Sequence, residues 1–225
     1  MDTGMEFNLN KPKRLGIFGG TFDPPHVGHL ILAMEAYDQL KLNKVLWVLT
    51  PDPPHKKGKK ITPIDIRLEM VMAAINNDPM FELSRVDIDR DGPHYVVDTM
   101  QRLHTIYQDE DLVFIMGGDS LLDLPSWHEP YNFLNLCDHI GVMHRPGEKI
   151  QLGELEKTFP AISNKVEFIE APLLEISSNM IRELAGEDKP FRYYLPQSVF
   201  RIVISFNLYN DHEYSNEEKI IQRPG

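Results

Sequence analysis

Two histidines, His26 and His29, lie three residues apart at the end of the stretch GGTFDPPHVGH, residues 19–29. Residues 15–18 form a short apolar run typical of a buried strand, and residues 30–37 have the periodicity and composition of a helix. The stretch is therefore predicted to be a turn from a strand into a helix. Such a turn presents backbone N–H groups and the positive end of a helix dipole at one point, which favours a phosphate group.

The two imidazoles allow three interpretations. Both rings can face one ligand and donate hydrogen bonds to phosphoryl oxygens. The spacing of His26 and His29 also suits two zinc ligands, but no cysteine, further histidine or carboxylate at ligand spacing completes such a site, so we assign no metal ligands. The pair can also simply cap or pack the start of the helix. We favour phosphate, while noting that histidine binds anions and metals alike.

The rest of the chain alternates between apolar runs and helical patterns. This alternation predicts an α/β fold with an open, doubly wound parallel sheet. Apolar runs short enough to be covered on both faces follow the first one at 44–50, 81–86, 111–116, 140–143 and 166–169.

Helical patterns separate these runs, and the last two make a small helical C-terminal part. No shift in composition marks a second domain, so we expect a polar leader at 1–13, one domain at 14–209 and a polar tail at 210–225. Helices are expected at 30–42, 62–75, 95–107, in two short pieces within 121–136, at 177–184 and at 196–209.

Composition and charge exclude several classes of function. The chain has 225 residues, a formal net charge of −11 and a pI near 5.2, so a nucleic-acid groove or an anionic membrane surface is not expected as its target. A single cysteine, Cys137, excludes an intrachain disulfide framework. No signal peptide and no apolar stretch long enough to span a bilayer is present, and we expect a cytoplasmic protein.

In an open α/β sheet, ligands bind at the carboxyl ends of the strands. Gly, hydroxyl and basic residues recur after the predicted strands, and this recurrence is a stronger signal than any one segment. Lys56 is as easily part of a solvated basic face as a ligand, and Trp127 as easily a core indole as an aromatic platform. The segments in question are 19–29, 51–60, 87–93, 117–119 and 144–147.

Two longer motifs resemble a known family. Residues 19–29 closely resemble the signature of nucleotidyltransferases with a His-x-Gly-His element, and ISSNMIR (176–182) resembles the ISSTxIR element of the adenylyltransferases in that superfamily. Shorter segments resemble landmarks of bacterial nicotinate-mononucleotide adenylyltransferases, in unbroken order over about residues 14–206. These are PHK (54–56), GGD (117–119), SW (126–127), RPG (145–147) and YYLP (193–196).

The resemblance implies a Rossmann-like nucleotidyltransferase fold and a reaction. ATP and nicotinate mononucleotide would give deamido-NAD and pyrophosphate, a step in NAD biosynthesis, by direct attack on the α-phosphate. Mg²⁺ would be carried mainly by the ATP phosphates. The partners would be these small molecules, with no nucleic acid or membrane, and a homo-oligomer is left open. The alternatives are a superfamily member that uses phosphopantetheine, nicotinamide mononucleotide or another phosphorylated acceptor, and a nucleotide sensor without catalysis.

The resemblance also implies roles for individual residues. His26, His29 and Arg182 would be catalytic, holding the ATP phosphates and the developing charge. ATP would be bound by Gly19, Gly20, Thr21, Phe22, His26, His29, Asp119, Ser177, Ser178 and Arg182. The mononucleotide would be bound by Gly20, Lys56, Tyr95, Val96, Trp127 and Arg145.

The sequence departs from the family pattern at two positions. The usual Ser-Tyr-Thr is here His94-Tyr95-Val96, so the threonine hydroxyl that would help hold the pyridine carboxylate is absent. Loss of this hydroxyl removes one group that could distinguish nicotinate mononucleotide, the acid, from nicotinamide mononucleotide, the amide. Asn179 replaces a threonine, but asparagine also caps helices, so we expect the anion-binding end before Arg182 to be kept.

Overall fold

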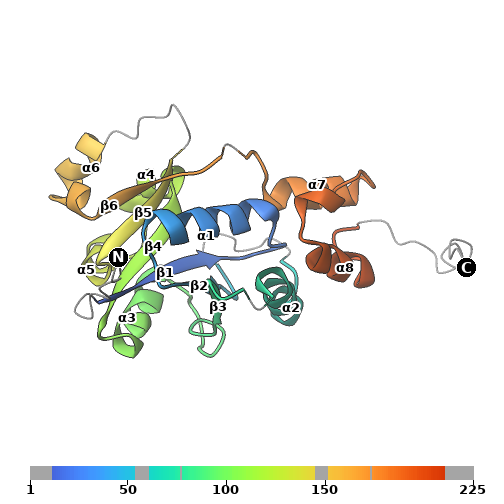
Figure 1. Ribbon diagram of the computed structural model, residues 1–225, viewed down its shortest axis with the longest axis horizontal. Coiled ribbons are helices and arrows are strands. Elements are labelled where there is room, and N and C mark those ends of the chain that lie inside the picture. Colours follow the sequence, from blue (N-terminus) through green and yellow to red (C-terminus); the bar gives the residue numbers. More distant parts are fainter. Residues whose placement is uncertain (1–11, 54–60, 77, 145–151, 173, 211–225) are drawn as a thin grey trace, which may run out of the picture.

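The fold of this chain is described by a computed structural model, which places residues 12–53, 61–76, 78–144, 152–172 and 174–210. Its centre is a six-stranded parallel sheet in the order β3-β2-β1-β4-β5-β6 (Figure 1). All six predicted strands and their parallel arrangement are confirmed. Their bounds are β1 Lys13–Gly20, β2 Lys44–Leu49, β3 Phe81–Ser84, β4 Glu110–Gly117, β5 His139–His144 and β6 Val166–Glu170.

The chain changes direction across the sheet between β1 and β4. It winds outward from β1 through β2 to β3, and then crosses to β4 and winds to the opposite edge. Ile17 at the centre of β1 pairs in register with Leu46 of β2 and Phe114 of β4. The carboxyl ends of β1 and β4 therefore form the topological switch point, where this class of sheet binds its ligands.

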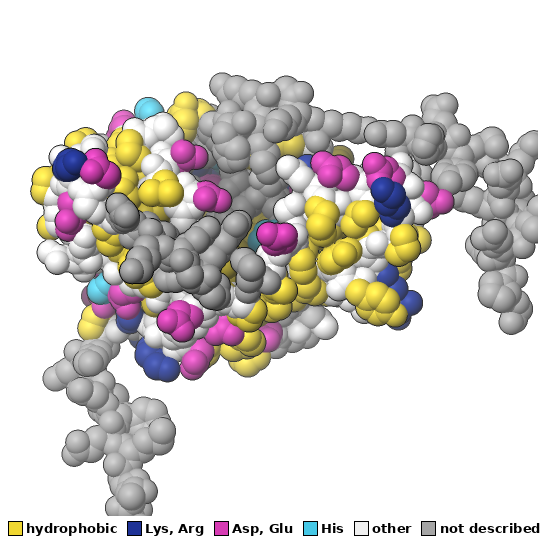
Figure 2. Space-filling model, turned by 90° about the horizontal axis from the view of Figure 1, so that it is seen from above, with side chains coloured by type: hydrophobic (Ala, Val, Ile, Leu, Met, Phe, Trp, Pro, Cys, Tyr) yellow, Lys and Arg dark blue, Asp and Glu magenta, His cyan; other side chains and the backbone are white. Residues whose placement is uncertain are grey.

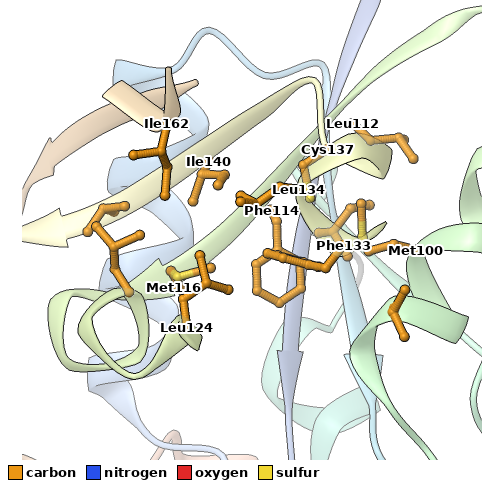
Figure 3. Packing of buried hydrophobic residues seen from close by; sticks show 14 of the residues in the cluster. Met100, Leu112, Phe114, Met116, Leu124, Phe133, Leu134, Cys137, Ile140 and Ile162 are labelled. Atoms are coloured by element: carbon orange, nitrogen blue, oxygen red, sulfur yellow. The ribbon is translucent and has the colours of Figure 1, made fainter. Parts of the chain in front are cut away.

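Both faces of the sheet are buried under helices. The α-helices are α1 Val27–Gln39, α2 Ile64–Ile75, α3 Val96–Ile106, α4 Gly118–Leu122, α5 Pro130–Leu136, α6 Leu152–Thr158, α7 Ser178–Gly186 and α8 Gln197–Ser205. Side chains of α1 and α2 pack on one face. Those of α3, α4, α5 and α6 pack on the other face, in a cluster of which Figure 3 shows a part. From Val45 onward β2 is apolar and supplies alternate residues to the two faces, Leu46 and Val48 to one and Val45 and Trp47 to the other. Burial on both faces explains why its sequence is an unbroken apolar run.

The predicted helical C-terminal part is confirmed. α7 and α8 lie together at one end of the molecule, with α2 beside α8 (Figure 1), and Met70 of α2 packs with Ile181 and Val199 in a third core cluster. Hydrophobic side chains gather on the visible face of this part, whereas acidic side chains are spread over the whole view (Figure 2). Of the helices in the described ranges, none is long and apolar enough to cross a membrane.

Two helical predictions need correction. α6 was not expected, because Leu155 is its one buried residue and so short an element carries no clear periodicity. The last helix was expected to run to residue 209 but ends at Ser205. Asn207 and Tyr209 have φ angles of 49° and 68°, a left-handed conformation that cannot continue a right-handed helix. The expected leader falls almost entirely, and the expected tail apart from residue 210, outside the described residues.

Candidate active site

A cavity of about 710 Å³ opens at the switch point. Its floor is formed by the carboxyl ends of β1 and β4, and its walls include Tyr95, Val96 and Trp127. A side chain at Gly19 or Gly117 would meet no atom within 4 Å, so these two glycines leave the floor open between the two halves of the sheet. Of the predicted site residues, Gly19, Gly20, Thr21, Tyr95, Val96 and Trp127 line this cavity.

Phe22 supports the cavity floor from below rather than lining it. Its side chain is 2% exposed and packs edge to face on Phe18, 5.5 Å away, and tilted on Trp47, 4.9 Å away. A Cβ atom on Gly20 would lie 2.8 Å from the Phe22 ring, so only glycine fits above it. The Phe22 side chain therefore supports the cavity floor, and the contact of Phe22 with nucleotide stays a prediction.

The turn after β1 is held by a buried arginine, Arg67 of α2, which is 2% exposed. Its guanidinium donates four hydrogen bonds to backbone carbonyls, at 3.0 Å to Thr21, 2.9 Å to Thr50, 2.7 Å to Pro51 and 2.7 Å to Thr62. Burial lowers the pKa of Arg67, while nearby Asp23 raises it, and an arginine remains protonated in either case. One side chain thus joins the ends of β1 and β2 to the start of α2.

His26 and His29 lie together at the start of α1, as predicted. Their rings are stacked with centroids 3.6 Å apart, and the backbone N–H of His26 donates to Nδ1 of His29 at 3.2 Å. Because Nδ1 of His29 accepts, the neutral ring carries its proton on Nε2, the nitrogen that can donate to a ligand. Gly28 makes room for the stack, since a Cβ there would lie 3.1 Å from Nδ1 of His26.

The second family-like motif meets the first one in space. Arg182 of α7 donates from Nη1 to the carbonyl oxygen of Asp23 at 2.7 Å, and also hydrogen-bonds Oδ1 of Asn179. Ser178 donates to the carbonyl oxygen of Pro24 at 2.8 Å. Ser177 caps α7 by accepting the N–H of Met180. The N-terminus of α7 is therefore fixed to the turn that carries His26 and His29.

Aromatic side chains form one wall of the cavity. Tyr95 stacks on His128 with ring centroids 4.1 Å apart. Trp127 is half-buried and packs against Phe114 and Phe133, so it is both a core and a cavity residue. Asp119 is exposed in the first turn of α4 and is not among the cavity-lining residues. Lys56 and Arg145 lie outside the described residues.

Sequence reasoning missed the charged cluster that shapes the loop before Tyr95. Asp87 is 3% exposed, accepts two contacts from the Thr99 hydroxyl at 2.8 and 3.0 Å, and pairs with Nε of Arg90 at 2.9 Å. Arg90 also donates to the carbonyl oxygen of Pro93 at 2.9 Å.

Among the described residues, no group of three or more His, Cys, Asp and Glu side chains is arranged to hold a metal ion.

The two adjacent glycines of the turn give a paired prediction. Gly20→Ala places a methyl group against the Phe22 ring, and such overpacking costs about 1–3 kcal/mol. Gly19→Ala meets no protein atom within 4 Å but intrudes on the cavity. We expect Gly20→Ala to lower the free energy of unfolding in urea, and Gly19→Ala to keep stability while weakening ATP binding about tenfold or more. Equal loss of stability in both variants would contradict this assignment.

The burial of His26 predicts a pH dependence of stability. Burial lowers its pKa from 6.5 to about 4, so the unfolded chain takes up a proton as pH falls below 6.5 and the folded chain does not until about pH 4. Stability is therefore full above pH 6.5 and lost towards pH 4, by about 3 kcal/mol in total.

His26→Gln removes this titration. Urea unfolding near pH 7 and at about pH 4.5 should show wild type losing about 2.5 kcal/mol more than the variant. The same loss in both proteins would show that His26 is not buried in its neutral form.

Comparisons with known proteins agree with this geometry. A family model described as cytidylyltransferase-like matches residues 17–184. A probable nicotinate-nucleotide adenylyltransferase of Thermomicrobium roseum is 43% identical over 200 residues, which cover 89% of this chain and 93% of that protein. The nicotinate-nucleotide adenylyltransferase of Bacillus subtilis is 39% identical over 197 residues, covering 88% of this chain and 98% of the relative.

A solved structure shares the fold. The nicotinic acid mononucleotide adenylyltransferase of Plasmodium falciparum, complexed with NaAD, matches with a TM-score of 0.72 at 21% identity, covering 88% of this chain and 97% of that one. The open parallel sheet and the matched length thus agree with the sequence similarity. The chain belongs to the cytidylyltransferase-like family and, within it, to the nicotinate-nucleotide adenylyltransferases.

Proposed function

We propose that this protein transfers the adenylyl group of ATP to nicotinate mononucleotide, giving deamido-NAD and pyrophosphate in NAD biosynthesis. The observation that carries the proposal is the junction of the two family-like motifs. Arg182 of α7 hydrogen-bonds the carbonyl oxygen of Asp23, three residues before His26, so the arginine and the paired imidazoles belong to one site. The relatives that bear this activity in their names match nearly the whole chain.

The reaction needs positioning more than a strong base. A phosphate oxygen of the mononucleotide attacks the α-phosphorus of ATP, a new P–O bond forms, and the bond to the β-phosphate oxygen breaks as pyrophosphate leaves. The nucleophile is already an anion, so the protein has to align the two phosphates and stabilise charge on the departing group. Backbone N–H groups, imidazoles and a guanidinium are suited to that task.

The two histidines would have different roles. At neutral pH, burial keeps His26 uncharged, with its pKa at about 4. His29 has Nδ1 engaged by the His26 backbone, which directs its proton to Nε2. We assign His29 to the phosphoryl oxygens and His26 to the stack that fixes its ring. Arg182 would hold the β- and γ-phosphates, where charge accumulates as pyrophosphate departs.

We propose that Mg²⁺ enters with ATP, held mainly by the phosphate oxygens. The donor groups of the turn and of α7 are nitrogens that bind phosphate, so they fit a metal that the nucleotide itself carries. When bound, Mg²⁺ would neutralise charge on the phosphates. The protein residues named above would orient the triphosphate of ATP.

The cavity walled by Tyr95, Val96 and Trp127 would take the pyridine ring. Trp127 and Tyr95 offer flat apolar faces for stacking, and the backbone of this wall can donate to a carboxylate. Val96 presents methyl groups where the family has a hydroxyl. The carboxylate of the pyridine ring would therefore be bound by backbone N–H groups without help from a side-chain hydroxyl. Lys56 and Arg145 remain predicted contacts to the mononucleotide, and Asp119 to the adenosine ribose.

The proposal is tested by comparing kcat/KM for nicotinate mononucleotide, nicotinamide mononucleotide and phosphopantetheine with Mg-ATP. We expect the acid to be the best substrate. His29→Ala should lower kcat about 10²–10³-fold, the usual effect of losing one donor to a developing charge. His104→Ala, an exposed histidine on α3, is the control and should behave as wild type. Turnover of phosphopantetheine alone, or full activity of His29→Ala, would overturn the assignment.

A further inference from the structure

The segment after α8 returns to the phosphate-binding turn through a single tyrosine. The hydroxyl of Tyr209 donates to Oδ1 of Asp23 at 2.8 Å, across 186 residues of sequence. The second carboxylate oxygen of Asp23, Oδ2, accepts the backbone N–H of Thr62 at 3.2 Å. Asp23 is 4% exposed, so its side chain is shielded from water, and each of its two carboxylate oxygens accepts a hydrogen bond.

The backbone of Asp23 points to a different partner. Its carbonyl oxygen accepts the hydrogen bond from Nη1 of Arg182 at 2.7 Å. A residue whose side chain is fixed at both oxygens has a backbone that is fixed too. The position of the carbonyl that holds Arg182 therefore depends on the contacts made by the Asp23 carboxylate.

We infer that Tyr209 is a positioning residue of the triphosphate site, because its hydroxyl fixes Asp23, and Asp23 in turn fixes Arg182. This inference rests on the proposed function, since it takes Arg182 as the ligand of the departing phosphates. It makes the segment after α8 part of the ATP site, although that segment lies outside the cavity and contains no residue of the family motifs.

The conformation of Tyr209 supports a role beyond packing. Its φ angle of 68° is uncommon for a residue with a side chain, and such conformations persist where neighbouring contacts hold them. Gly186, the last residue of α7, makes room for this turn, since a Cβ there would lie 3.2 Å from the carbonyl oxygen of Tyr209. The backbone thus bends in a way that delivers the hydroxyl to Asp23.

The hydroxyl remains a donor over the working pH range. Burial raises the pKa of Tyr209, and the neighbouring Asp23 raises it further. The ring itself packs at the edge of the core cluster formed by α2, α7 and α8. Ring and hydroxyl therefore have separate functions, and removing the hydroxyl alone tests the inference without removing the packing.

The test is Tyr209→Phe, with Tyr194→Phe as the matched control. Tyr194 packs on the same cluster, and its hydroxyl has no hydrogen-bond partner in the described part of the chain. We expect Tyr209→Phe to raise the KM for Mg-ATP about fivefold or more, and to leave the KM for nicotinate mononucleotide unchanged. Tyr194→Phe should leave both values at wild type. A merely structural role would lower the folded fraction, which reduces kcat but moves neither KM.

Calorimetric titration with Mg-ATP alone provides a readout that does not require turnover. The dissociation constant should rise by the same factor in Tyr209→Phe as the KM does. Unchanged ATP binding in this variant, or an equal rise in both KM values, would overturn the inference. Failure of wild type to use nicotinate mononucleotide would instead contradict the proposed function, while the ATP titrations would still decide the role of Tyr209.

Discussion

The buried guanidinium of Arg67 is the interaction on which the site depends. Four carbonyl oxygens, from the turn after β1, the end of β2 and the start of α2, accept its N–H groups. A buried arginine is costly unless it is fully paired, and here the carbonyls and nearby Asp23 supply that pairing. Loops at strand ends lack the hydrogen bonds between neighbouring strands that fix the carbonyl groups of a sheet. The hydrogen bonds from Arg67 fix the loop carbonyls instead. The turn after β1 is therefore held in place by the protein itself.

Rigidity matters because the proposed chemistry consists mainly of alignment. The sheet places the ends of β1 and β4 side by side, Gly19 and Gly117 leave the space between them open, and Phe22 fills the volume beneath Gly20. α1 and α7 then bring imidazoles and a guanidinium to the same turn, through contacts at Asp23 and Pro24. Two nucleotides that share such a floor would meet with their phosphates adjacent, and little further reorganisation would be needed.

The features that could be predicted from the sequence are those that depend on a local pattern of residues. Apolar runs identified all six strands, and the glycine-rich turn with its two histidines was placed correctly at the start of α1. Arg67 was missed because its role depends on carbonyls from three separate segments. A signal was present, since Arg67 shares a helical stripe with the buried Met70, Val71 and Ile75. Tyr209 was assigned to a helix, and its contact with Asp23 depends on a left-handed bend that no composition indicates.

The most direct test of the account follows the adenylyl group itself. Protein would be mixed with Mg²⁺, nicotinate mononucleotide and ATP that is radiolabelled in the α-phosphate. In-line transfer on a preformed site predicts that the label enters the dinucleotide in step with the release of unlabelled pyrophosphate. It also predicts that no label stays on the protein when the mononucleotide is omitted. Label bound covalently to the protein, or ATP cleavage without labelled dinucleotide, would contradict the account.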